Sequence, residues 1–179
     1  TAAKIAWTTA QANPKLLAGA VPGEGGGDYG DGAVDDEFNW AAAELFITTG
    51  EQPYLDYVKV ASQFKSASKM AGGASAFDWG AMDALGTISL ALVPNGLDKA
   101  DVEALCQQIT TTADQYLTTI TREGYAVPIP ASGYIWGSNS LVLNNTIILG
   151  LAHHFTGKQE YLTGMSQSLD YILGHNALN

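Results

Sequence analysis

Acidic side chains gather at one point, directly after a glycine-rich stretch. Asp35, Asp36 and Glu37 follow residues 19–32, where glycine recurs, and they open an apolar helical pattern. Carboxylates and the carbonyl oxygens of a glycine-rich loop are the hard ligands that calcium takes, about 6 to 8 per ion. Three acids in a first helical turn also complement the helix dipole without any ion. The spacing lacks the EF-hand order, so a cation site here would be irregular and would need a third carboxylate from elsewhere.

Two tryptophans lie at predicted boundaries between a loop and a helix. Trp79 follows Asp78, and Trp136 precedes Gly137. Aromatic faces at loop ends suit sugars, because the C–H face of a pyranose packs on the ring while nearby polar groups bind the hydroxyls. The alternative for Trp79 is a packed cap at the helix boundary, and the alternative for Trp136 is a core tryptophan, since large aromatic side chains are buried on average.

Other reactive residue types do not form a recognisable site. His153 and His154 are neighbours on a predicted helix and point roughly 100° apart, so they cannot chelate one metal ion together. Cys106 is the only cysteine, which excludes an internal disulfide, and its simplest role is packing in the core. The glycine-rich stretch lacks the Lys-Ser/Thr pair of a phosphate-binding loop.

Composition and charge limit the partners of the protein. The 179 residues favour one domain without an internal boundary, and 46% of them are hydrophobic. Eighteen acidic against eight basic residues give a net charge of −10, which disfavours nucleic acid and anionic membranes as partners. No apolar run reaches the length of about 18 residues that would predict a membrane span. A neutral partner fits this chain better.

Apolar periodicity predicts an all-α fold. A first short helix ends at Asn13-Pro14, and a second runs from Asp35 to a glycine cap at Gly50. Further helices are predicted at 53–69, 80–93, 98–122, 138–156 and 158–173. Only residues 124–130 have β character, and their two prolines confine them to an edge strand or a loop.

An internal repeat in the sequence predicts how the helices are connected. Residues 46–55 and 153–162 each contain a Thr-Gly helix stop followed by a Tyr-Leu pair. Two turns of the same chemistry favour antiparallel helical hairpins repeated around a layer, as in a toroid or solenoid, over an irregular bundle.

Three segments carry a resemblance to a known family. They are residues 35–50, Trp136-Gly137-Ser138-Asn139-Ser140 with Leu143-Asn144-Asn145, and residues 169–179. Together they resemble glycoside hydrolase family 9, the inverting cellulases. The resemblance implies part of an (α/α)6 barrel, with residues 1–179 forming an incomplete catalytic domain of a secreted enzyme that cleaves β-1,4-glucosidic bonds. The family's Asp-Ala-Gly-Asp base motif and its downstream acid are absent from the sequence, so no catalytic residue is assigned.

The resemblance also implies a structural calcium site. Asp36, Glu37 and Asp83 match carboxylates that hold the ion, and Gly32 and Ala33 match positions that offer backbone carbonyls. Some family members have Ser-Gly where this chain has Gly-Ala, so a side-chain ligand is lost at that point.

Substrate contacts follow from the same resemblance. Trp136 and Trp79 match aromatic platforms for the sugar, and Tyr29 or Asp31 falls near a cleft position. The implied partners are cellulose or a cello-oligosaccharide, and the remaining part of the catalytic domain, on this or a separate chain. The alternatives are a non-catalytic helical scaffold, a glycan-binding half barrel that needs a partner chain, and another helical toroid enzyme such as a polysaccharide lyase or phosphorylase.

Overall fold

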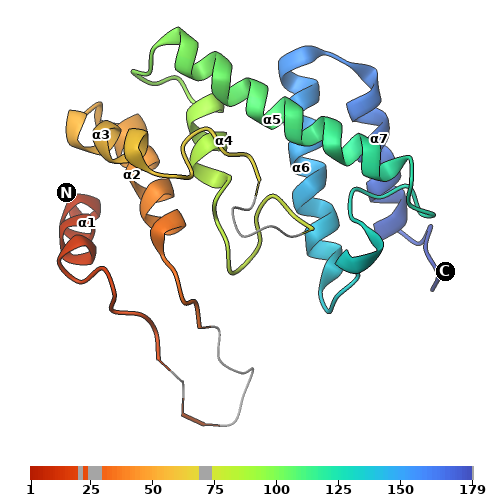
Figure 1. The fold of residues 1–179 in the computed structure, drawn as a ribbon, viewed down its shortest axis with the longest axis horizontal. Helices are drawn as coiled ribbons and strands as arrows, with labels where there is room; N and C mark the ends of the chain where they lie inside the picture. The colour runs from red at the N-terminus through yellow and green to blue at the C-terminus, as the bar shows by residue number, and fades with distance from the viewer. Residues whose placement is uncertain (20–21, 24–29, 69–73, 179) are drawn as a thin grey trace.

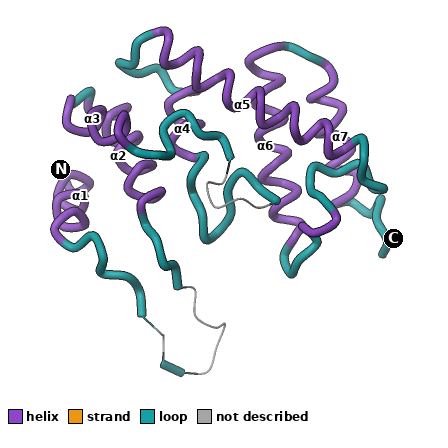
Figure 2. The backbone as a smooth tube through the Cα atoms, in the orientation of Figure 1, coloured by secondary structure: helices purple, strands orange, loops and turns teal. Residues whose placement is uncertain are grey.

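The helices account for all the regular elements in the part of the chain that the structure describes. The computed structural model describes residues 1–19, 22–23, 30–68 and 74–178, and in these ranges the all-α prediction is confirmed (Figure 2). The elements are α1 (Ala2–Ala12), α2 (Asp35–Thr49), α3 (Gln52–Val60), α4 (Leu85–Leu92), α5 (Lys99–Ile120), the 3-10 helix η1 (Ala131–Gly133), α6 (Ser138–Thr156) and α7 (Gln159–Ile172). None of these helices is long and apolar enough to cross a membrane.

Helices α2, α4 and α6 run in the same direction, so that one end of the molecule collects their starts (Figure 1). Helix α7 runs back beside α6, α5 crosses obliquely, and α3, α5 and α7 each pack against the helix that precedes them in the chain. The segments that precede α2, α4 and α6 therefore lie at the same end of the layer.

The two turns of the internal repeat have the same backbone conformation and the same hydrogen bond. Gly50 and Gly157 both adopt the left-handed conformation with a φ of 69°, which favours glycine. In each turn the preceding threonine, Thr49 or Thr156, accepts a hydrogen bond on Oγ1 from the N–H of the residue after the glycine, at 3.2 Å. The α2–α3 and α6–α7 hairpins thus end and restart by one mechanism.

The helix predicted at 53–69 is too long. It ends at Val60, because Ala61 is extended with a ψ of 139° and the chain continues through turns to Lys65, whose φ is 61°. The residues up to 69 include no signal of this break that periodicity would detect.

One other helix boundary needs correction, and the alternatives for residues 124–130 are resolved. The helix predicted at 80–93 begins at Leu85, because Asp78 and Ala81 exchange two backbone hydrogen bonds (2.9 and 3.1 Å) that close a tight turn. The stretch 124–130 is a loop rather than an edge strand, with Ala126 at a φ of 53°.

Apolar side chains from all the major helices form the core. Ile109, Ile148, Leu149 and Tyr161 centre one cluster between α5, α6 and α7. A second cluster joins α2, α3, α4 and α5 around Phe46, Tyr54, Val58, Leu90 and Leu105. Ala91 packs against both clusters, so the two groups of helices share side-chain contacts.

Candidate functional site

Asp36 links the start of α2 to the segment that leads into α4. Its side chain is buried, and Oδ2 accepts a hydrogen bond from the N–H of Met82 at 2.5 Å. The next residue is Asp83, which is also buried. The structure therefore brings the backbone beside Asp83 against Asp36, although 46 residues separate Asp36 from Met82.

Glu37 is electrostatically unfavourable where it stands. Its Oε2 is buried and has no hydrogen-bond partner. Burial, followed by a side-chain hydrogen bond with Asp36 and the nearby charges of Asp36 and Asp31, raises the pKa of Glu37 to about 7. An unsatisfied buried acceptor costs free energy, and a bound cation is one way to compensate it.

The side chains alone do not complete a metal centre. Within the described residues, no three histidine, cysteine, aspartate or glutamate side chains are arranged to hold an ion. Oxygen ligands from the backbone would have to contribute, and Gly32 and Ala33 are exposed just before α2. The Ala33 N–H donates to Asp31 Oδ1 at 3.1 Å, a local turn just before α2. Calcium stays a prediction at this site.

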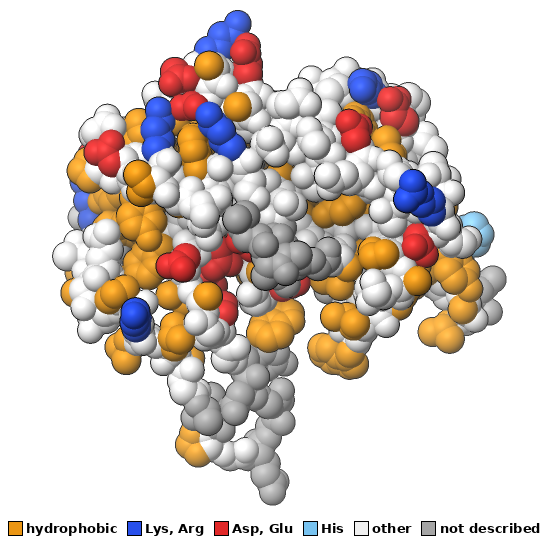
Figure 3. All heavy atoms as spheres, viewed as in Figure 1, with side chains coloured by type: hydrophobic (Ala, Val, Ile, Leu, Met, Phe, Trp, Pro, Cys, Tyr) orange, Lys and Arg blue, Asp and Glu red, His pale blue; other side chains and the backbone are white. Residues whose placement is uncertain are grey.

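Both candidate aromatic platforms are exposed. Trp79 lies in the tight turn between Asp78 and Ala81 and is 69% exposed, and Trp136 lies just before α6 and is 94% exposed. The interpretation of Trp136 as a core tryptophan is wrong, and the exposure of Trp79 does not fit a packed helix cap. Since α4 and α6 begin at the same end, the two indoles belong to the same end of the molecule, where Figure 3 shows hydrophobic side chains along the lower edge.

The remaining predicted contacts are less informative. Asp31 is half-buried in the segment before α2. Tyr29 lies outside the described residues. An additional cavity of about 390 Å³ lies at the same end, where the tyrosines Tyr125, Tyr134 and Tyr171 approach one another.

The sequence profile of "Glycosyl hydrolase family 9" matches residues 1–179, the whole of this chain. The chain belongs to that family. Among curated relatives, a cellulose 1,4-beta-cellobiosidase of Acetivibrio thermocellus is 41% identical over 99% of this family 9 chain and 22% of that protein. Endoglucanase C of Cellulomonas fimi is 39% identical over 99% of the chain and 16% of that protein.

Solved family 9 structures have the same arrangement of helices. A GH9 protein of Bacteroides ovatus superposes with a TM-score of 0.81 and 28% identity over 97% of this chain and 33% of that one. The fold is therefore part of an (α/α)6 barrel, as the family resemblance implies and in agreement with the toroid or solenoid predicted from the internal repeat. The family 9 chain spans less than a quarter of the two curated relatives and about a third of the solved chain.

The sequence alone did not predict a role for two asparagines of this family 9 chain that anchor loops by hydrogen bonds. Asn144 and Asn145 entered only as letters of a motif, yet Asn145 is fully buried and hydrogen-bonds to two separate loops. The available signal was an adjacent pair of amides within an otherwise apolar helix, because buried amides need partners.

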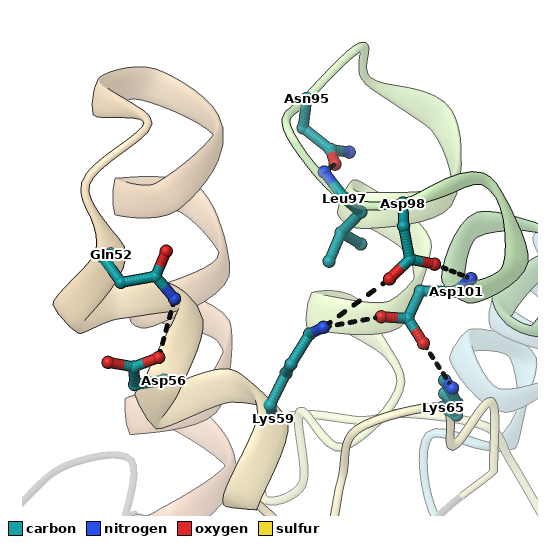
Figure 4. Close-up of polar contacts among 8 residues, drawn as sticks. All are labelled: Gln52, Asp56, Lys59, Lys65, Asn95, Leu97, Asp98 and Asp101. Atoms are coloured by element: carbon teal, nitrogen blue, oxygen red, sulfur yellow. Dashed lines mark hydrogen bonds and ion pairs between the residues drawn. The ribbon is translucent and has the colours of Figure 1, made fainter.

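A second polar cluster was also missed, and it is remote from the aromatic end. Asp101, near the start of α5, accepts hydrogen bonds from Lys65 at 2.6 Å and Lys59 at 2.9 Å, which lower the pKa of Asp101 (Figure 4). The cluster joins α3, the turn after it and α5. These side chains bind one another, so the cluster stabilises the helix arrangement of this chain rather than offering a ligand site.

Proposed function

We propose that this chain is part of a secreted cellulase that hydrolyses β-1,4-glucosidic bonds with inversion. The segment would supply barrel helices, part of the sugar-binding cleft and a calcium site. The observation that carries the proposal is the exposure of Trp79 and Trp136 at one end of a family 9 helical layer. The names of the two curated relatives, a cellobiosidase and an endoglucanase, support β-1,4-glucan as the substrate class.

In this proposal the segment binds substrate and other segments carry out the chemistry. Inverting hydrolysis needs a general base that activates water and a general acid that protonates the leaving oxygen, on opposite sides of the bond. The family's Asp-Ala-Gly-Asp base motif and its downstream acid are both absent from residues 1–179. We therefore expect this segment alone to release no reducing sugar from carboxymethylcellulose, and the remaining part of the catalytic domain to be its partner.

Calcium would stabilise the edge of the cleft. Asp36, Glu37 and Asp83 would hold the ion with carbonyl oxygens of Gly32 and Ala33. The fit is supported by the partnerless Oε2 of Glu37 and by the burial and neighbouring acidic groups that raise the pKa of Glu37. The ion would supply positive charge and fix the segment before α2, and it would take no part in bond cleavage.

The substitution Trp136→Ala in the full-length enzyme tests the sugar platform. We expect the affinity for cellotetraose, measured by calorimetry, to fall by about tenfold, because an aromatic face against a sugar ring contributes on the order of 1 kcal/mol. The melting temperature should not change, since Trp136 is 94% exposed. The control is Leu92→Ala, which removes an exposed side chain at the far end of α4 and should leave affinity unchanged.

The reaction itself is tested by the products of the full-length enzyme. Proton NMR of early products should show the α-anomer first if hydrolysis inverts the configuration. Unchanged cellotetraose affinity in Trp136→Ala would contradict the platform. Binding without hydrolysis would favour the alternative of a non-catalytic glycan-binding module.

A further inference from the structure

Asn145 is a fully buried amide that serves three backbone partners. Its Nδ2 donates to the carbonyl oxygens of Ala74 at 2.6 Å and Pro128 at 2.8 Å, and its Oδ1 accepts from the N–H of Ala76 at 3.0 Å. Both amide protons are used, and the two carbonyl partners fix which end of the amide is nitrogen. One side chain on α6 therefore holds the loop at residues 74–76 and the loop at residue 128 together.

The first of these loops carries Trp79. Beyond Ala76, the Phe77 carbonyl accepts a hydrogen bond from Asn144 Nδ2 at 2.8 Å. The Asp78–Ala81 turn follows, and Met82 then binds Asp36. The loop is thus anchored on α6 at one side and on α2 at the other, with Trp79 in the turn between the anchors.

The second loop leads to Trp136. Val127 and Ile129, on either side of Pro128, are completely buried, and η1 follows directly. A Cβ added to Gly133 would lie 2.8 Å from Ala74 Cβ, so the two loops touch at this glycine. The asparagine and the glycine contact therefore join both indole-bearing loops into one packed unit.

We propose that Asn145 is a positioning residue that fixes the spacing between Trp79 and Trp136, and thereby determines that both indoles contact the same glucan chain. The inference rests on the proposed function, because it takes the two indoles as sugar platforms. Without the amide, the buried carbonyls of Ala74 and Pro128 lose their donor, and the loops are free to separate. Asn145 touches no sugar in this account and acts through the two loops.

The test is a double-mutant cycle in the full-length enzyme with cellohexaose and cellobiose as ligands. Asn145→Asp is nearly isosteric, but at neutral pH it places a second oxygen against the two carbonyls. Trp79→Ala should weaken cellohexaose binding by about tenfold in the wild type and by less than about twofold in Asn145→Asp. Cellobiose, too short to span both platforms, should bind Asn145→Asp with nearly wild-type affinity.

Two controls separate positioning from general damage. Thr146→Val alters the next buried residue, whose hydroxyl donates to the Val142 carbonyl within α6, and it should leave the tenfold cost of Trp79→Ala intact. Lowering the pH should partly restore cellohexaose binding in Asn145→Asp, because a protonated carboxyl again donates one hydrogen bond. If Asn145→Asp does not fold, Asn144→Ala removes the Phe77 contact alone and should reduce the Trp79→Ala cost in part.

The outcomes distinguish this inference from the proposed function. A Trp79→Ala cost that is the same in wild type, Asn145→Asp and Asn144→Ala overturns the positioning role while leaving both platforms in place. If neither Trp79→Ala nor Trp136→Ala changes the affinity of the otherwise wild-type enzyme for cellohexaose, the two indoles are not sugar platforms, and the positioning role is overturned with them. Equal weakening of cellobiose and cellohexaose by Asn145→Asp also contradicts the inference, since general damage does not depend on chain length.

Discussion

Burial of Glu37 beside Asp36 makes the stability of the α2 start depend on pH when no cation is bound. The pKa of Glu37 is raised from 4.5 to about 7, so the folded state holds the proton more tightly than the unfolded state. This contribution is present in full below 4.5 and is lost as the pH rises through about 7. We expect the melting temperature of chelator-treated protein to fall by ~2–4 °C between about pH 5 and pH 8 because of this group. The fall should be absent in Glu37→Gln, and an equal fall in both proteins would contradict the assignment.

Calcium binding at the same residues gives a separate prediction. A ligand that binds only the folded state raises its stability by mass action, so calcium should raise the melting temperature of the full-length enzyme above its value in chelator. The rise should be lost in Asp83→Ala, because this substitution removes one of the three carboxylates. The matched control is Asp114→Ala, which lies on α5 and binds the Tyr161 hydroxyl instead. If calcium and chelator give the same midpoint in wild type and in Asp83→Ala, the calcium site is refuted.

The types of the site residues could be predicted from the sequence, but their environments could not. Carboxylates after a glycine-rich stretch and tryptophans at loop ends can be recognised directly in the sequence. The exposure of Trp136 and the partnerless oxygen of Glu37 depend on which residues pack around them, and those residues lie on other helices. For the same reason Asn145 was missed, since its three partners lie 17 to 71 positions away.

The glycine that ends α6 illustrates how local chemistry determines an element boundary. Gly157 has a φ of 69°, and a Cβ there would meet nothing within 4 Å, so only the backbone conformation resists substitution. Gly157→Ala should therefore lower the free energy of unfolding by about 1 kcal/mol, the usual cost of a left-handed alanine. Gly124→Ala is the matched control, because that glycine also has open space but no positive φ, and it should have little effect. Chemical denaturation of both variants measures the difference.

Helix ends were predictable where a cap residue marks them and were missed where a tertiary contact decides them. The ends at Thr49 and Thr156 follow from the glycines after them, and the start at Lys99 follows from Asp98, whose side chain accepts from the Asp101 N–H. The late start of α4 has a different cause. The Asp78–Ala81 turn precedes it, and the Met82 N–H after this turn donates to Asp36 on α2. Periodicity within residues 80–93 contains no sign of that distant partner.

The repeated helical hairpins bring segments that are distant in the sequence to the same end of the molecule. Because α2, α4 and α6 run in the same direction, the segments before them lie at a common rim at one end of the layer (Figure 1). The hydrogen bond from the Met82 N–H to Asp36 joins two of these segments. The internal repeat in the sequence predicts antiparallel hairpins repeated around a layer. It does not predict the contacts across the rim, such as Gly133 against Ala74, that determine how far apart the indoles lie.

The N-terminal helix shows what surface the isolated segment exposes. No residue of α1 is buried, and an apolar groove of about 910 Å³ lies between α1 and α2, lined by Trp7, Phe38, Leu45 and Leu16 among others. Leu16 is 82% exposed. Exposed apolar surface of this kind favours association in water, so we expect residues 1–179 alone to form oligomers or aggregates as their concentration rises.

Sedimentation velocity across a range of concentrations measures that association. Leu16→Ser should reduce it without lowering the melting temperature, because the substituted side chain packs little in the folded segment. The full-length enzyme should stay monodisperse under the same conditions, since its remaining helices would cover the groove. A monodisperse monomer of residues 1–179 that melts cooperatively would contradict the incomplete barrel, because a layer whose apolar groove needs no cover behaves as a finished domain.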